Sequence, residues 1–93
     1  MADNSLVPAN EIWYTTTDGK TIKLKGLIQA VASNTYKKKE GKGVIVFKEP
    51  VVEIKNETFR RFESLQSIIL PEGITSIGED AFRDCENLQE VVI

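Results

Sequence analysis

Residues 51–93 carry one core pattern twice, and this repetition limits the folds open to the chain more than any other feature. Each core position of the first copy recurs 23 residues later without a gap. A unit of this length cannot bury its own apolar side, whereas two stacked units can, so the period predicts a solenoid of two coils. The paired positions are Val51 with Ile74, Ile54 with Ile77, Thr58 with Ala81, Phe59 with Phe82, Phe62 with Cys85, Leu65 with Leu88, Ile68 with Val91 and Leu70 with Ile93.

Each repeat is expected to contain a short strand, a turn and a short helix. Alternating apolar residues at 65–70 and 88–93 are typical of strands. Ala81, Phe82 and Cys85 have the spacing of a helix with one buried side. The pattern therefore predicts an α/β repeat fold. The 23-residue register further predicts that residues 44–47, 67–70 and 90–93 are neighbouring strands of one parallel sheet.

Residues 12–24 contain the strongest β-hairpin signal of the chain. Two β-rich runs are joined by Asp18-Gly19, a dipeptide that accepts the positive φ angles of a type I′ turn. The runs cover residues 12–17 and 20–24. In the register of a two-residue loop, the face that we expect to be buried consists of Trp13, Ile22 and Leu24.

The repeat register also extends weakly into the residues before position 51, which predicts a degenerate first coil. Ile45 and Phe47 stand 23 residues before Ile68 and Leu70, and Val31 and Tyr36 stand 23 residues before Ile54 and Phe59. A chain of 93 residues supports a single core. We therefore expect one structural domain in three parts: a disordered leader (1–10), a β-rich N-terminal cap with the degenerate coil (11–50) and two repeats (51–93).

The composition argues against catalysis and against several classes of ligand. The chain has no histidine and one cysteine, and its net charge is -2, so we expect no enzyme activity, metal, cofactor or nucleic-acid partner. Cys85 aligns with Phe62, which favours a core side chain over a reactive thiolate. The acidic residues Glu79, Asp80 and Asp84, like the lysines of 37–42, are expected to be solvated.

The motif Leu-x-x-Ile-x-Leu-Pro-x-Gly-Ile-x-x-Ile-Gly-x-x-Ala-Phe-x-x-Cys-x-x-Leu at residues 65–88 resembles the BspA-type leucine-rich repeat of bacterial surface proteins. The segments 12–20, 33–36 and 43–47 are similar to the region that precedes the repeats in such proteins. The resemblance implies a right-handed solenoid with a parallel sheet on its concave side and short helices or turns on its convex side. It also implies an extracellular or cell-surface location and adhesion to host or matrix proteins. Residues 1–10 contain no export signal, and no apolar run is long enough for membrane insertion.

The outward side of the expected strands is the candidate protein-binding surface. An apolar ladder should form there at 23-residue spacing, and an apolar stripe on a solenoid's strand face is typical of protein recognition. The candidate residues are Val44, Val46, Ser67, Ile69, Glu90 and Val92. A purely structural capping role without a ligand is the alternative, and glycan binding is a third. The side of the second coil that no further repeat covers predicts self-association through that coil.

Overall fold

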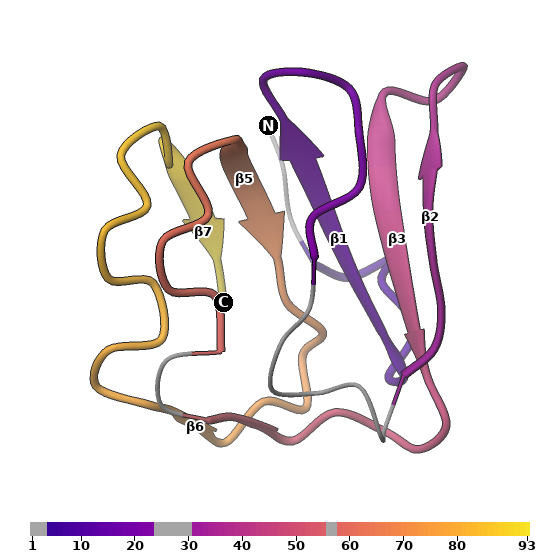
Figure 1. The fold of residues 1–93 in the computed structure, drawn as a ribbon. Helices are drawn as coiled ribbons and strands as arrows, with labels where there is room; N and C mark the ends of the chain where they lie inside the picture. Colours follow the sequence, from indigo (N-terminus) through magenta and orange to yellow (C-terminus); the bar gives the residue numbers. More distant parts are fainter. Residues whose placement is uncertain (1–3, 24–30, 56–57) are drawn as a thin grey trace.

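The computed structural model describes residues 4–23, 31–55 and 58–93 (Figure 1). Strands and turns make up these three ranges, which contain no helix and therefore none that could cross a membrane. The expected short helices are wrong for the described residues. The strands are β1 (Glu11–Thr16), β2 (Val31–Lys37), β3 (Lys42–Phe47), β4 (Glu53–Ile54), β5 (Leu65–Ile69), β6 (Ser76–Ile77) and β7 (Glu90–Val92).

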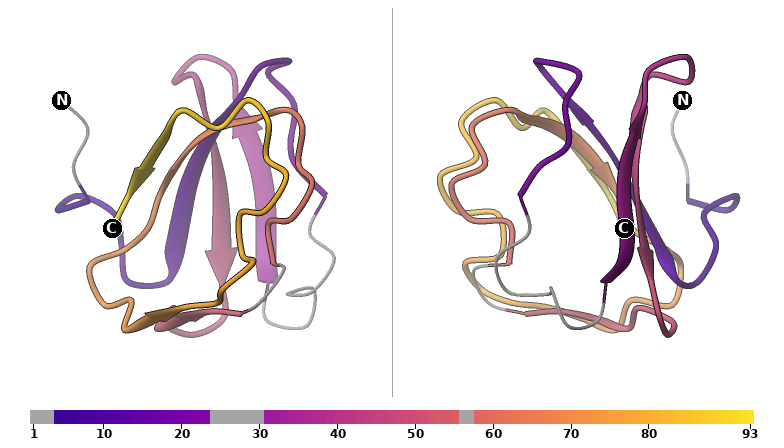
Figure 2. Two further views of the ribbon diagram at one scale, coloured as in Figure 1. Left: turned by 90° about the vertical axis from the view of Figure 1, so that its left-hand side faces the viewer. Right: turned by 45° about the vertical axis from the view of Figure 1, so that its right-hand side comes forward.

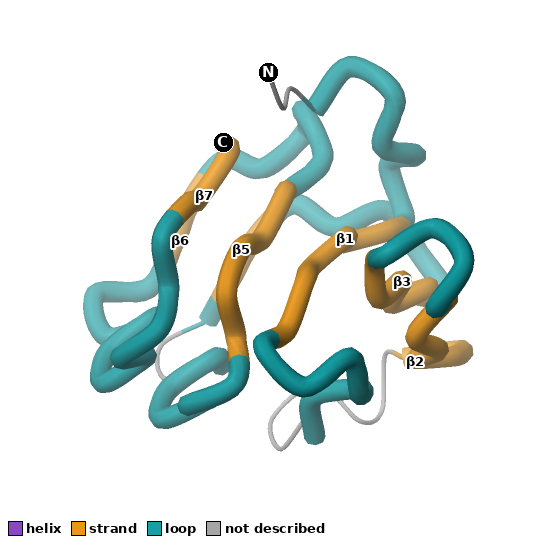
Figure 3. The backbone as a smooth tube through the Cα atoms, turned by 90° about the horizontal axis from the view of Figure 1, so that it is seen from above, coloured by secondary structure: helices purple, strands orange, loops and turns teal. Residues whose placement is uncertain are grey.

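The main sheet has five strands in the order β2-β3-β1-β5-β7. Figure 3 shows the loops of the two coils on one side of this sheet. β1 lies in the middle and pairs antiparallel with both β3 and β5, while β5 and β7 are parallel. The parallel pairing of residues 67–69 with 90–92 is confirmed. The prediction that residues 44–47 pair with residues 67–70 is wrong, because β1 lies between β3 and β5.

The expected hairpin of residues 12–17 and 20–24 does not form. Both edges of β1 are already hydrogen-bonded, to β3 and to β5, so no edge remains for residues 20–23, which form no strand. Asp18-Gly19 still turns the chain, with Gly19 at a φ of 67°. The Thr16 hydroxyl closes the turn, since it donates to Lys20 O (2.9 Å) and accepts from Lys20 N (3.1 Å). Leu24 lies outside the described residues.

The buried face of β1 is opposite to the one expected. Ile12, Tyr14 and Thr16 are buried, whereas Trp13 is only half-buried. Alternation along the strand then places Trp13 on the face turned away from the core. Ile22 is buried as expected, although it reaches the core from a loop.

Tyr14 determines how closely β3 approaches β1. Its hydroxyl donates to Asn34 Oδ1 (2.6 Å), and its ring covers Gly43, the residue opposite it on β3. A Cβ atom on Gly43 would lie 2.2 Å from Tyr14 Cζ, so only glycine fits this position. The Tyr36 ring of β2 packs edge to face against the Tyr14 ring, with 6.2 Å between the two ring centroids. Because Tyr36 stands in a strand, it does not occupy the coil position that the degenerate first repeat predicts for it.

The two coils of residues 51–93 stack directly on each other. Both views of Figure 2 show the two coil traces running side by side. The parallel pairs β5–β7 and β4–β6 join them on two sides. Backbone hydrogen bonds continue around the coil, among them Thr75 N to Val52 O (2.7 Å) and Gln89 N to Gln66 O (2.8 Å). The main buried core residues are Ile12, Tyr14, Ile45, Ile54, Phe59, Leu65, Ile68 and Leu70.

The turns at residues 58–62 and 79–85 replace the expected helices because their backbone groups bond between coils. Phe59 N donates to Ala81 O (2.8 Å) and Arg61 N donates to Arg83 O (2.9 Å), so these groups do not bond within a helix. Ala81 N and Cys85 N form short-range turn bonds to the third residue before them. Ala81, which was expected to face the core in this segment, is nevertheless buried.

Residues 4–10 are ordered against the body, which differs from the expected disordered leader. Phe47 N donates to Asn10 O and Val51 N donates to Ala9 O, both at 2.8 Å. Val7 is buried, although the adjacent Leu6 is exposed. Figure 2 shows this segment on the side of the main sheet opposite to the coils. It therefore bounds the outward side of the sheet near the end of β3.

Candidate functional site

The outer face of the main sheet, meaning the face turned away from the coils, carries an apolar row across the sheet. Strand register places Trp13 opposite Val44 on one side and opposite Ile69 on the other. Ile69 is in turn opposite Val92, and Val44 is opposite Thr35. We call this set the outer row: Thr35, Val44, Trp13, Ile69 and Val92.

The structure brings together only part of the candidate surface expected from the sequence. Ile69 and Val92 are neighbours, as are Ser67 and Glu90. Val46 is separated from Ile69 by β1 and lies opposite Glu11, so the expected continuous ladder of Val46, Ile69 and Val92 is wrong. Val44 is 5% exposed and can support the row but offers little surface to a partner. The other five candidates are half-buried or exposed.

Trp13 is the residue that sequence reasoning missed, and it lies at the centre of the outer row. The Lys42 Nζ atom lies 3.3 Å from its ring centroid, a cation–π contact. Its indole N–H donates to Glu11 Oε1 at 2.9 Å. These contacts fix the ring on the outer face. The polar residues Glu11 and Thr15, which share its face by alternation, were the sequence signal that could have identified this side as the outward one.

A second set of outward residues, the polar row, runs beside the outer row. Lys37 is opposite Lys42, and Thr15 is opposite Ser67, whose neighbour is Glu90. The Thr15 and Ser67 hydroxyls are hydrogen-bonded at 2.6 Å. The polar row therefore changes from positive charge on β2 and β3 through paired hydroxyls to a carboxylate on β7.

Cys85 and the neighbouring aspartates of the second coil make structural contacts. Cys85 is half-buried, its Sγ atom donates to Phe59 O (2.8 Å), and burial raises the pKa of its thiol, so the thiolate is disfavoured. Asp84 lies 3.8 Å from Arg61 Nε and 3.9 Å from Arg83 Nε. Asp80 lies 3.9 Å from Arg83 Nη1. Within residues 4–23, 31–55 and 58–93, no three carboxylate, thiol or imidazole side chains come together as a calcium or other metal site would need.

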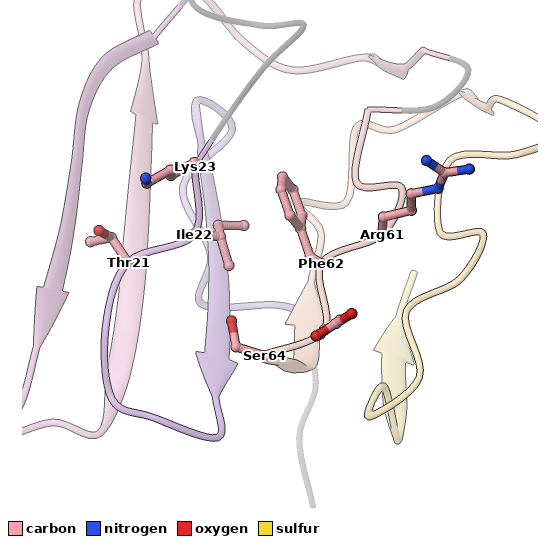
Figure 4. Close-up of a pocket in the computed structure, with 7 residues that line it drawn as sticks. Thr21, Ile22, Lys23, Arg61, Phe62 and Ser64 are labelled. Atoms are coloured by element: carbon pink, nitrogen blue, oxygen red, sulfur yellow. The ribbon is translucent and has the colours of Figure 1, made fainter.

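An open depression of about 410 Å³ lies between the loop after β1 and the turn of the first coil (Figure 4). Its charged side chains do not converge, because Lys23 and Arg61 point away from each other with Ile22 and Phe62 between them. Arg61 is also paired with Asp84. The depression therefore does not present the converging polar groups that fix a small ligand. It is lined by Thr21, Ile22, Lys23, Arg61, Phe62, Glu63 and Ser64.

Comparison with protein families gives one match. The model of the BspA type Leucine rich repeat region (6 copies) matches residues 9–93, which includes both coils and nearly the whole N-terminal part. No significant similarity to a curated protein or to a solved structure was found.

Proposed function

Because the chain belongs to the BspA-type leucine-rich repeat family, we propose that it is a non-catalytic module that binds a protein partner through the outer face of its main sheet. Repeats of this family are generally protein-interaction modules, which supports binding over catalysis. The outer row is the observation that assigns binding to this particular face. Its central Trp13 is held in place by Glu11 and Lys42, so little entropy would be lost when a partner covers it.

The composition of the surface supports protein recognition. Trp is one of the residue types enriched among the strongest contributors to protein–protein affinity, and such residues lie centrally with less important contacts around them. Trp13 has this position, with Ile69 and Val92 on one side. Ser67, Glu90 and Val46 complete the proposed surface, while Val44 supports it from below.

The family also supports a location at a bacterial cell surface and adhesion to host or matrix proteins as the finer function. The purely structural alternative is a capping unit for further repeats that binds nothing itself. A glycan-binding role is a third candidate, since aromatic platforms also bind sugars, but Lys42 already covers one side of the Trp13 ring.

Binding of the purified chain to a panel of immobilised matrix proteins tests the proposal. Trp13→Ala and Ile69→Asp should abolish most of any binding that the native chain shows. The matched control is Val52→Asp, which introduces the same charge at an exposed valine on the coil side, and it should leave binding unchanged. Equal loss in all three variants, or binding that none of them changes, would contradict the proposed surface.

Self-association through the second coil is a second candidate function, supported by a specific contrast in burial. Ile68 and Leu70 of the first coil are fully buried, whereas their repeat counterparts Val91 and Ile93 are 36% and 70% exposed. β7 also has an unpaired edge in the described part of the sheet. Sedimentation over a concentration series tests it: Val91→Lys should reduce association, and a native chain that stays monomeric throughout would contradict it.

A further inference from the structure

The β2–β3 hairpin makes one end of the outer face strongly positive. Lys37, Lys38, Lys39 and Lys42 lie within six residues, together with the single carboxylate of Glu40. Glu40 is 3.8 Å from Lys37 Nζ and 4.0 Å from Lys42 Nζ, and contacts of this length are weak ion pairs. The hairpin therefore keeps most of its positive charge available to a partner. We call these four lysines the lysine hairpin.

The positive charge adjoins the outer row directly, since Lys42 lies over the Trp13 ring. Glu90 lies at the far edge of the same face, on β7. At the opposite end of β3, residues 4–10 bound the face through the hydrogen bonds of Asn10 and Ala9. The surface open to a partner is thus mainly apolar in its middle and positive at the hairpin, with the carboxylates of Glu11 beside Trp13 and of Glu90 on β7.

A partner that contacts both Lys42 and Val92 must span the distance between β3 and β7. From β3, which carries Lys42, to β7, which carries Val92, the sheet order gives three inter-strand steps. At the spacing of neighbouring strands these steps span about 14 Å. An extended chain covers that distance with about four residues.

We propose that the partner presents an acidic–apolar protein segment, with carboxylates that meet the lysine hairpin and apolar side chains that lie along Trp13, Ile69 and Val92. The inference rests on the proposed function and names the chemistry of the partner at that site. A carboxylate near Lys42 would replace the weak contact of this lysine with Glu40. A basic segment is disfavoured, because like charges placed together across an interface weaken binding. Acidic and apolar residues should stand within about four positions of each other in the partner.

A library of short random peptides, selected on the immobilised chain and afterwards assayed one by one for binding to Ile69→Asp, provides the test. Selected peptides should be enriched in Asp and Glu close to large apolar residues. For a selected synthetic peptide, we expect Lys37→Glu to reduce affinity about tenfold at low salt and added salt to weaken native binding. Lys55→Glu, the same charge change at an exposed lysine of the first coil, should have little effect.

The outcomes separate this inference from the proposed function. Peptides that depend on Ile69 but are neutral or basic, or that bind Lys37→Glu as well as the native chain, would overturn the acidic–apolar inference and leave the binding surface in place. Selection of peptides that bind Ile69→Asp equally well would overturn the proposed surface and the inference with it.

Discussion

The rings of Phe59 and Phe82 stack with 5.5 Å between their centroids and an angle of 4° between their planes. The two residues are 23 positions apart, which is the repeat period of the sequence. Their near-parallel rings mean that the second coil reproduces the first after a simple translation. The stack is the most direct structural expression of the repeat, and the coil interface should depend on it.

We expect Phe59→Ala to destabilise the fold by about 3 to 5 kcal/mol, because it empties a fully buried position between the coils. Phe82→Ala should cost less, since Phe82 is half-buried on the open side of the second coil. Urea unfolding followed by circular dichroism measures both losses. Equal losses would indicate that the second coil is covered as well as the first.

The 23-residue register was sufficient to predict the stacking of the two coils and the parallel pairing of β5 with β7. It was sufficient because each coil has an apolar side that a stacked copy of the coil can cover. The helix expected around Ala81 was wrong for a tertiary reason. Backbone groups such as Phe59 N bond to the neighbouring coil, which a pattern within one repeat cannot reveal.

The position of β1 could not be predicted from local signals. Asp18-Gly19 favours a hairpin, but β3 and β5 compete for the same strand edges, and such long-range pairing is absent from any short window of sequence. Both faces of β1 carry an aromatic residue, Trp13 or Tyr14, so alternation alone did not decide which face is buried. The inversion moved Trp13 from the expected core into the candidate site.

Adjacent isoleucines on β5 should respond very differently to the same substitution. Ile68 is fully buried, so Ile68→Asp places an unpaired carboxylate in the core at a cost of several kcal/mol, comparable to the total stability of a small domain. Ile69 lies on the outer face, so Ile69→Asp should retain the fold and reduce binding. Thermal melts monitored by circular dichroism distinguish them, and similar losses of melting temperature would contradict the assignment of faces.

Two glycines form a matched pair for testing the contact between β1 and β3. Gly43→Ala would force a Cβ atom to within 2.2 Å of Tyr14 Cζ, and we expect a loss of about 1 to 3 kcal/mol from overpacking. At Gly73 the nearest atom to an added Cβ is Val51 O at 3.9 Å, so Gly73→Ala should be close to neutral. Chemical denaturation measures both. A tolerated Gly43→Ala would mean that Tyr14 does not lie over β3.

The stability of the fold should decrease at alkaline pH through Cys85. Burial raises the pKa of its thiol above the ordinary value of 9.0, so the unfolded state loses the proton first. The protonated Cys85 thiol therefore adds to the free energy of unfolding below pH 9, and this stabilisation is lost as pH rises through the folded-state pKa. Unfolding free energies of the native chain and Cys85→Ala across this window should differ in slope. Identical slopes would contradict a raised pKa.

The indole resonance of Trp13 gives the most direct test of the central claim, that the outer face centred on this residue is the binding surface. Trp13 is the only tryptophan, so its indole N–H produces a single assignable NMR signal. Titration of the labelled chain with a bound protein or selected peptide should shift this signal together with the amides of Ile69 and Val92. A saturable interaction that leaves these three signals unchanged and shifts the amides of residues 79–87 instead would contradict the account.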